Sequence, residues 1–214
     1  MVAPYLATPA TDVMNPFGEF ATATIHVVDY QAADAGRCAA MQKLATPVTD
    51  ELTAELDGAA RWLGVASDEI LLAALARTIA RTLGDGVVPV DIASQGRCLL
   101  NSVPLVCATA RQASATEVLG GVRRGLAAAG RSTHGSSEVY FNYIGAVAEE
   151  MVPALEAPPG LGHALELRVY RIGDLVHLDW WFDASRFERY TVEELTEQFP
   201  LALYEMTSDA LPPL

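Results

Sequence analysis

The pattern of apolar and polar side chains, together with residue types that favour strands, predicts strands over residues 21–28, 87–93 and 136–145. Residues 21–28 (ATATIHVV) alternate between apolar and polar side chains, with the period of a half-buried strand. Residues 87–93 (VVPVDIA) are rich in valine and predict a second strand, in which Pro89 should lie at a sheet edge or near the strand start. Residues 136–145 (SSEVYFNYIG) predict a third, because aromatic and β-branched residues favour a pleated surface.

The last third of the chain predicts a β-hairpin. Residues 163–172 (HALELRVYRI) and 175–183 (LVHLDWWFD) have the composition of strands, and only Gly173 and Asp174 separate them. A two-residue connector that contains glycine lets right-twisted strands turn back on each other. We therefore expect these two strands to pair antiparallel.

Helical spacing of apolar residues predicts two consecutive helices in the first half of the chain. Residues 50–63 place leucines and an alanine on one helical face, and Gly64 follows as a left-handed stop. The next helix is predicted to begin with Ser67 as its N-cap and to end at Gly84.

Two more helices are predicted from a Ser/Thr-x-x-Glu pattern. In this capping box, the Ser or Thr side chain and the Glu side chain each accept a hydrogen bond from the other residue's backbone N–H at the start of the helix. Ser114 and Glu117 predict the start of a helix that ends at Gly130. Thr191 and Glu194 predict the start of the last helix by the same pattern.

The predicted order of elements is β-α-α-β-α-β-β-β-α, with the acidic residues 147–162 as a loop and with no internal repeat. We expect one α/β domain, an α+β sandwich with a mixed sheet and helices mostly on one face. In this division residues 1–20 are an N-terminal extension and residues 21–210 are the domain. Hydrophobic residues make up 51% of the chain, which is ample for a sizeable core.

The net charge of the chain limits the classes of partner that it is expected to bind. The formal net charge of −13 disfavours binding to nucleic acid and to anionic lipid, because an acidic surface repels both. Arg123 and Arg124 form the only basic doublet on a predicted helix; such a doublet can meet a phosphate but more often forms surface ion pairs. No apolar run approaches the length of a bilayer span. We expect a cytoplasmic protein that binds neither nucleic acid nor membranes.

Sequence motifs for catalysis are sparse. The chain has no P-loop, no glycine-rich dinucleotide turn, no GxSxG elbow and no HExxH. Three cysteines without a CxxC spacing predict neither a disulfide framework nor a zinc site. Isolated histidines on strands are more often satisfied polar groups than bases. We therefore predict no catalytic residue and no metal ligand from these patterns; the histidines concerned are His26, His134, His163 and His177.

Two aspartates on one predicted strand allow two interpretations. Asp179 and Asp183 share a face with Trp181, and paired carboxylates can do acid–base work when burial separates their pKa values. The simpler interpretation, which we favour, is a solvated strand face followed by a turn. Trp180 and Phe182 lie on the opposite face and are expected in the core.

Asn142 is unexpected in the middle of a predicted strand. Its amide lies between Phe141 and Tyr143, and an unsatisfied buried amide would cost about 1–3 kcal/mol. The side chain should therefore either hold a neighbouring loop or face a cavity.

Three stretches, taken in order, resemble one protein family. Residues 138–145 (EVYFNYIG) resemble the FNYLG motif of the condensation and epimerisation domains of non-ribosomal peptide synthetases. Residues 91–106 (DIASQGRCLLNSVPLV) resemble the preceding EGHGRE region, and residues 176–195 resemble the closing strand and helix. The resemblance runs from about Phe20 to Ala210. It implies a chloramphenicol-acetyltransferase-like fold, of which this chain would be the C-terminal half.

The departures from that family bear on function. The HHxxxDG motif, which furnishes the base in the N-terminal half, has no counterpart, since no two histidines are adjacent. By the resemblance, Ala93 stands where epimerases carry a glutamate implicated in proton transfer, and Gln95 stands where they carry a histidine. Asn142 and Tyr143 match the family's Asn-Tyr pair beside the channel between the halves, and Arg97 would hold the adjacent loop. The candidates for lining this cleft or tunnel are thus Asn142, Tyr143, Arg97 and Gln95, and none of them is predicted to be catalytic.

The resemblance leaves three functional hypotheses. The leading one is a half-domain without activity of its own, an interaction or structural module of peptide-synthetase machinery that covers its apolar face by forming a homodimer. The second is a split acyl or aminoacyl transferase, completed by a separate N-terminal half and acting on carrier-bound thioesters. The third is a degenerate protein that binds thioesters or other small molecules. No cofactor is predicted, although a phosphopantetheine-bound substrate and a peptidyl carrier protein are expected partners of such machinery.

Overall fold

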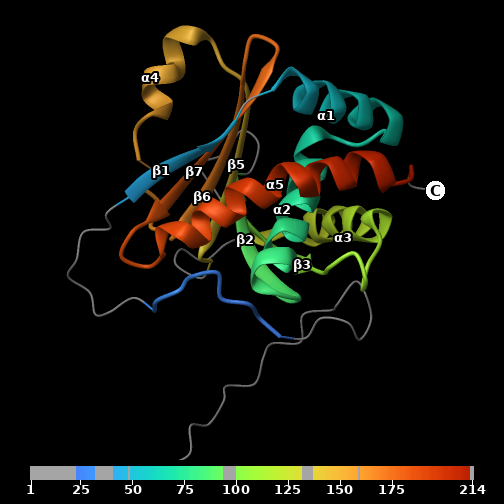
Figure 1. Cartoon of the computed structure of the whole chain (residues 1–214), viewed down its shortest axis with the longest axis horizontal. Helices are drawn as coiled ribbons and strands as arrows, with labels where there is room; N and C mark the ends of the chain where they lie inside the picture. Colours follow the sequence, from blue (N-terminus) through green and yellow to red (C-terminus); the bar gives the residue numbers. More distant parts are fainter. Residues whose placement is uncertain are drawn as a thin grey trace, which may run out of the picture.

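The described part of the chain is a mixed β-sheet with the helices α1, α2, α3 and α5 on one face, and Figure 1 shows it as a computed structural model. This arrangement confirms the predicted α/β class. The structure describes residues 23–31, 41–47, 49–93, 100–131, 137–158 and 160–212. The strands are β1 (Met41–Thr46), β2 (Gly86–Ala93), β3 (Leu100–Cys107), β4 (Gly130–Arg131), β5 (Val139–Ala146), β6 (Leu165–Ile172) and β7 (Leu175–Asp183). The helices are α1 (Asp50–Leu63), α2 (Ser67–Leu83), α3 (Ala115–Ala128), α4 (Val152–Leu155) and α5 (Arg189–Asp209), with a 3-10 turn at Glu149–Met151.

The seven strands lie in the order β1-β7-β6-β5-β2-β3-β4. β2, β5 and β6 are parallel neighbours at the centre, and the outer pairs are antiparallel. β6 and β7 form the predicted hairpin, which turns at Gly173 with φ of 56°. Central parallel strands bring together residues that are far apart in sequence, and this placement builds the site described below.

The first predicted strand is not a regular strand. In residues 23–28 the structure has a single bridge, between Thr24 and Val87. β1 and β3 were not predicted, because MQKLAT and LNSVPLVC lack a clear alternation of apolar and polar residues. β2 is an interior strand, but its pairing with β5 begins only at Val90. On the side of β5, Pro89 precedes the residues that are paired. On the side of β3, it lies opposite Pro104, so neither proline has to donate a hydrogen bond to the other strand at this pair.

The predicted helices α1, α2 and α3 are present, with small differences at their ends. Gly64 ends α1 in the left-handed conformation, with φ of 64°. α2 ends at Gly84 as expected, but its N-cap is Ala66 rather than Ser67, which is the first helical residue. The capping box of Ser114 and Glu117 is formed at the start of α3.

The capping box predicted for the last helix is wrong, because α5 is capped from a distant segment. The helix begins at Arg189, so Thr191 already lies in its first turn. The carboxylate of Asp29 accepts a hydrogen bond from the Glu188 backbone N–H at 2.7 Å and another from the Thr191 hydroxyl at 3.2 Å. A carboxylate at this position satisfies an otherwise unpaired N–H group and complements the positive end of the helix dipole.

The apolar core lies between the sheet and the four helices. Trp180, which is 0% exposed, packs edge-to-face against Phe199 with ring centroids 5.5 Å apart. Its indole Nε1 donates to the Thr46 hydroxyl at 3.0 Å, so the one polar atom of this core ring is satisfied. Trp180 and Phe182 are thus in the core, as predicted. Among the helices that the structure describes, none is long and apolar enough to cross a membrane.

Candidate functional site

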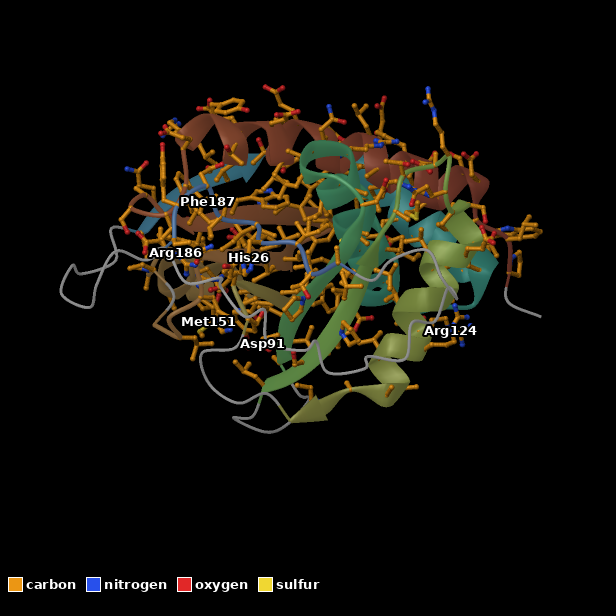
Figure 2. The ribbon with its side chains drawn as sticks, turned by 90° about the horizontal axis from the view of Figure 1, so that it is seen from below. His26, Asp91, Arg124, Met151, Arg186 and Phe187 are labelled. Atoms are coloured by element: carbon orange, nitrogen blue, oxygen red, sulfur yellow. The ribbon has the colours of Figure 1, made fainter. Side chains whose placement is uncertain are left out.

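The sheet face opposite the four helices carries a row of polar and aromatic side chains. The pairing register places one such residue at directly neighbouring positions of β2, β5, β6, β7 and β1, and side chains at paired positions lie on the same face. Figure 2 shows Asp91, one member of this row, on the side of the sheet away from α5. We call the five residues the transverse row; they are Asp91, Tyr140, Glu166, Trp181 and Lys43.

A buried histidine joins one end of the transverse row. His163 precedes β6, and its Nε2 lies 2.9 Å from Oδ2 of Asp91. The side chains of His163 and Asp91 are only 6% and 1% exposed. The imidazole stacks on Tyr140 with ring centroids 5.2 Å apart. Burial, and after it the charge of Glu166, raises the pKa of Tyr140 to about 12, so its hydroxyl stays protonated at neutral pH.

The Asp91–His163 pair has the form of a carboxylate-held imidazole. In the tautomer in which Nε2 donates to Asp91, Nδ1 is the acceptor nitrogen of the ring. Nδ1 of His163 is buried and has no hydrogen-bond partner among the described residues. A carboxylate that orients an imidazole in this way is the side-chain arrangement found in many general bases.

Asn142 joins β5 to β6 through the neighbouring carboxylate. Its Nδ2 donates to Oε1 of Glu166 at 2.9 Å, and Nε of Arg168 donates to the same oxygen at 2.9 Å. Nη1 of Arg168 continues to the carbonyl oxygens of Leu155, in α4, and of Ala157, the latter at 3.2 Å. The amide therefore holds the adjacent strand, and Arg168 extends this network to the segment that follows α4.

The aspartates of β7 are not on a solvated face, contrary to the interpretation favoured from sequence. Asp179 and Asp183 are 4% and 7% exposed. The Tyr170 hydroxyl donates to Asp179 at 3.0 Å, and Nζ of Lys43 lies 3.5 Å from the same carboxylate. Lys43 also binds Glu156, which follows α4, at 2.6 Å. The segment around α4 thus shields a face that alternation alone assigned to solvent.

The structure separates the residues expected to line one cleft. Asn142 points to the polar face, whereas Tyr143 packs against the helix-side core and, with Phe141, lines a small cavity of about 50 Å³. Neighbouring residues of a strand point to opposite faces, which accounts for this separation. Gln95 and Arg97 lie outside the described residues.

Sequence reasoning missed several members of this site. The alternation of Glu166 and Arg168 within LELRVYRI was visible and indicated a polar face on a strand. Asp91 and His163 are 72 positions apart, and only the parallel pairing of β2, β5 and β6 brings them together. No local pattern signals that contact.

A second polar cluster fastens the N-terminal segment to the sheet. The carboxylate of Glu138 accepts hydrogen bonds from the Val27 backbone at 2.9 Å and from Nη2 of Arg186 at 3.2 Å, and it lies 3.1 Å from Nδ1 of His26. These side chains border a cavity of about 230 Å³, and Figure 2 shows His26 and Arg186 on the same side of the molecule. In the described ranges, no group of three or more His, Cys, Asp or Glu residues is arranged to hold a metal ion.

Replacing Asn142 with alanine should lower the free energy of unfolding by about 1–2 kcal/mol, because the buried carboxylate of Glu166 loses the hydrogen bond that the Asn142 amide donates to it. Urea unfolding of Asn142→Ala, Glu166→Gln and the double variant would measure this. We expect the two effects to be non-additive. Additive effects would show that the contact contributes no energy.

The sequence was compared with family models and with curated proteins. No family model matches the sequence. The chain is 35% identical over 217 aligned positions to a subunit of the phenolphthiocerol/phthiocerol polyketide synthase of Mycobacterium tuberculosis. The corresponding protein of Mycobacterium bovis is equally similar. The alignment covers 80% of this chain but only 15% of that much longer protein.

Solved structures share the fold at low sequence identity. The epimerization domain from the third module of tyrocidine synthetase B has a TM-score of 0.67 at 14% identity, over 87% of this chain and 52% of that one. The first condensation domain of the CDA synthetase has a TM-score of 0.58 at 19% identity, over 82% and 47%. The complex of the X-domain and OxyB from teicoplanin biosynthesis gives 0.60 at 15%, over 91% and 51%. The chain therefore spans about half the length of these domains.

Proposed function

This chain has the chloramphenicol-acetyltransferase-like fold of one half of a condensation or epimerisation domain, the C-terminal half by the order of its motifs, and on this premise we propose that it is a half-site module of assembly-line biosynthesis. Its role is condensation-like: it supplies one wall of a transfer cleft and is inactive on its own. A site between two halves needs both of them, and the HHxxxDG base of the other half is absent from this sequence.

One observation carries this proposal. The chain covers 52% of the solved epimerization domain while 87% of the chain itself is covered, and a match of about half of that domain supports the assignment to one lobe. The chain is similar to 15% of a polyketide synthase subunit, and this similarity supports a role in acyl chemistry on carrier proteins. We assign the cleft to the side of the sheet that carries the transverse row.

A transfer assay with small pantetheine thioesters and an amine acceptor tests the proposal without any carrier protein. We expect no transfer by the purified chain and no change in the rate of thioester loss above background. Transfer by the chain alone would overturn the proposal.

The Asp91–His163 pair favours a second function, that of a split acyl or aminoacyl transferase. In such a split transferase, a separate polypeptide supplies the half that carries HHxxxDG. His163, on the wall of the cleft that this chain supplies, assists proton transfer during the reaction. Co-expression with an N-terminal condensation half should give a stoichiometric complex with transfer activity in the same assay. His163→Gln should lower that activity at least tenfold, while His177→Gln, on the same sheet face, should not.

A lobe without its other half leaves apolar surface to cover, and we propose a homodimer in the absence of such a partner. Light scattering at micromolar concentration tests this, and a clean monomer would remove it. If the chain is instead a thioester-binding protein, pantetheine thioesters should raise its melting temperature.

A further inference from the structure

The cavity beside Glu138 lies apart from the transverse row, since none of the residues that border it belongs to that row. Its volume is about 230 Å³, below the range of roughly 300–1,000 Å³ for pockets that hold drug-sized ligands, so it fits a smaller molecule. Residues 23–28 form one wall, and backbone hydrogen bonds of 2.9 Å join Ala23 and Ile25 to Val87 of β2. Three apolar side chains contribute to the lining; they are those of Ile25, Val88 and Pro89.

Two opposite charges and an imidazole border this cavity. The carboxylate of Glu138 and the guanidinium of Arg186 are each 19% exposed, and Nη2 of Arg186 lies 3.2 Å from Oε1 of Glu138. His26 is more exposed, at 64%, and its Nδ1 lies 3.1 Å from the same oxygen (Figure 2). Among the described residues that border the cavity, no other side chain can carry a charge. The cavity thus presents one cation and one anion side by side.

The guanidinium of Arg186 has a donor that the described part of the chain does not use. Its Nη2 binds Glu138, but its Nε is buried and has no hydrogen-bond partner among the described residues. The backbone carbonyl of Arg186 accepts hydrogen bonds from the backbone N–H groups of Asp29 at 3.0 Å and Tyr30 at 3.1 Å, so this residue is held in place. An unpaired buried donor is unfavourable and indicates an acceptor from outside, and a carboxylate matches the fork of a guanidinium.

Glu138 can receive the opposite end of the same ligand. Its Oε2 accepts the Val27 backbone N–H at 2.9 Å, and its Oε1 contacts His26 and Arg186. An ionised carboxylate has about four acceptor positions, so these three contacts leave room for one more donor. An ammonium group is the donor that complements its negative charge.

We propose that this cavity binds a free amino acid with a small apolar side chain, whose carboxylate pairs with Arg186 and whose ammonium group pairs with Glu138. The apolar part of the lining receives the side chain. A zwitterion has no net charge, so the net charge of −13 of the chain does not oppose its approach. A carrier-bound aminoacyl thioester lacks the free carboxylate, so this inference concerns a different ligand from the substrates of the proposed function and does not rest on that function.

Ligands with a single charge fit the cavity less well. A carboxylic acid without an amine brings a second carboxylate beside Glu138, and the acidic chain repels it at long range. An amine without a carboxylate leaves Nε of Arg186 unpaired and meets the positive charge of that side chain.

The test titrates the full chain with L-alanine, propionate and L-alanine methyl ester, with binding followed by calorimetry up to millimolar ligand. L-Alanine should bind roughly tenfold more tightly than either analogue, because each analogue lacks one of the two charges. Arg186→Met should weaken the binding of L-alanine roughly tenfold or more. Arg189→Met is the matched control, because Arg189 is 59% exposed and does not border the cavity; it should leave the affinity unchanged.

A glycine substitution tests the wall of the cavity while both charged side chains stay in place. A Cβ atom at Gly86 would lie 2.6 Å from Cγ1 of Ile25 and 2.7 Å from the backbone oxygen of Ala23, so Gly86→Ala must displace residues 23–25. We expect this variant to bind L-alanine more weakly. Gly58→Ala is the control, since a Cβ at Gly58 has no neighbour within 4 Å. Melting temperatures of all variants would establish that they are folded.

Glu138→Gln distinguishes recognition of a zwitterion from recognition of a carboxylate alone. It should weaken the binding of L-alanine but not that of propionate, and this comparison decides the matter even if Arg186→Met does not fold. No binding of L-alanine at millimolar concentration, equal affinities for L-alanine and propionate, or an unchanged affinity in folded Arg186→Met would each overturn the inference. The transfer assay of the proposed function uses thioesters, so the two proposals fail separately.

Discussion

Replacing Arg77 with methionine should lower the free energy of unfolding by about 3–5 kcal/mol, since removal of one partner leaves buried polar groups uncompensated. The guanidinium is 0% exposed and lies between α2 and the loop that leads to α3. Its Nη2 donates to the Ala113 carbonyl at 2.6 Å and its Nη1 to the Ala108 carbonyl. Its Nε lies 3.0 Å from the Glu205 carboxylate on α5. One side chain thus ties three parts of the helical layer together.

Arg81→Met is the matched control for this prediction. Arg81 pairs with the same Glu205 at 2.6 Å but is 29% exposed, so its loss should cost about 1 kcal/mol or less. Urea denaturation of both variants would measure the difference. Equal losses of stability would show that the two carbonyl contacts of Arg77 do not contribute.

Replacing Arg168 with methionine should also cost about 3–5 kcal/mol, because it leaves the Glu166 carboxylate buried without a cation. Glu166 is 1% exposed, and Arg168 Nε lies 2.9 Å from it. The variant also loses the bonds to the carbonyl oxygens of Leu155 and Ala157, so amide hydrogen exchange should accelerate around α4.

A second substitution distinguishes buried charge from lost packing in this variant. Glu166→Gln removes the uncompensated charge, so Arg168→Met/Glu166→Gln should regain part of the lost stability. Arg171→Met serves as the control on the same strand, since its partner Asp57 is 41% exposed and its loss should cost about 1 kcal/mol or less. A double variant no more stable than Arg168→Met would contradict the charge argument.

The elements that the sequence predicted are those with strong local patterns. α1 and α3 have an apolar stripe and local end signals, and the hairpin of β6 and β7 has its turn within two residues. β1 and β3 are defined by their neighbours in the sheet, which a local window does not contain. The start of α5 was missed for the same reason, because Asp29 caps it from a segment 159 positions away.

The candidate site was foreseen only in part. Asn142 was singled out as a polar group in need of a partner, and the structure gives that partner as Glu166 on the next strand. The contact between Asp91 and His163 depends on the order of strands, which pattern reasoning left open. The burial of Asp179 depends on a covering segment that has no periodicity of its own.

The Asp29 cap has a consequence for how this protein comes into being. The carboxylate leaves the ribosome 159 residues before the amide that it binds, so the two meet only once all the intervening polypeptide has been made. Until then the Asp29 carboxylate lacks its partners at the start of the last helix, although Thr24 and Val27 of the same segment can already pair with Val87 and Glu138. The closure of this fold is therefore a late event, and it joins two segments whose synthesis is widely separated in time.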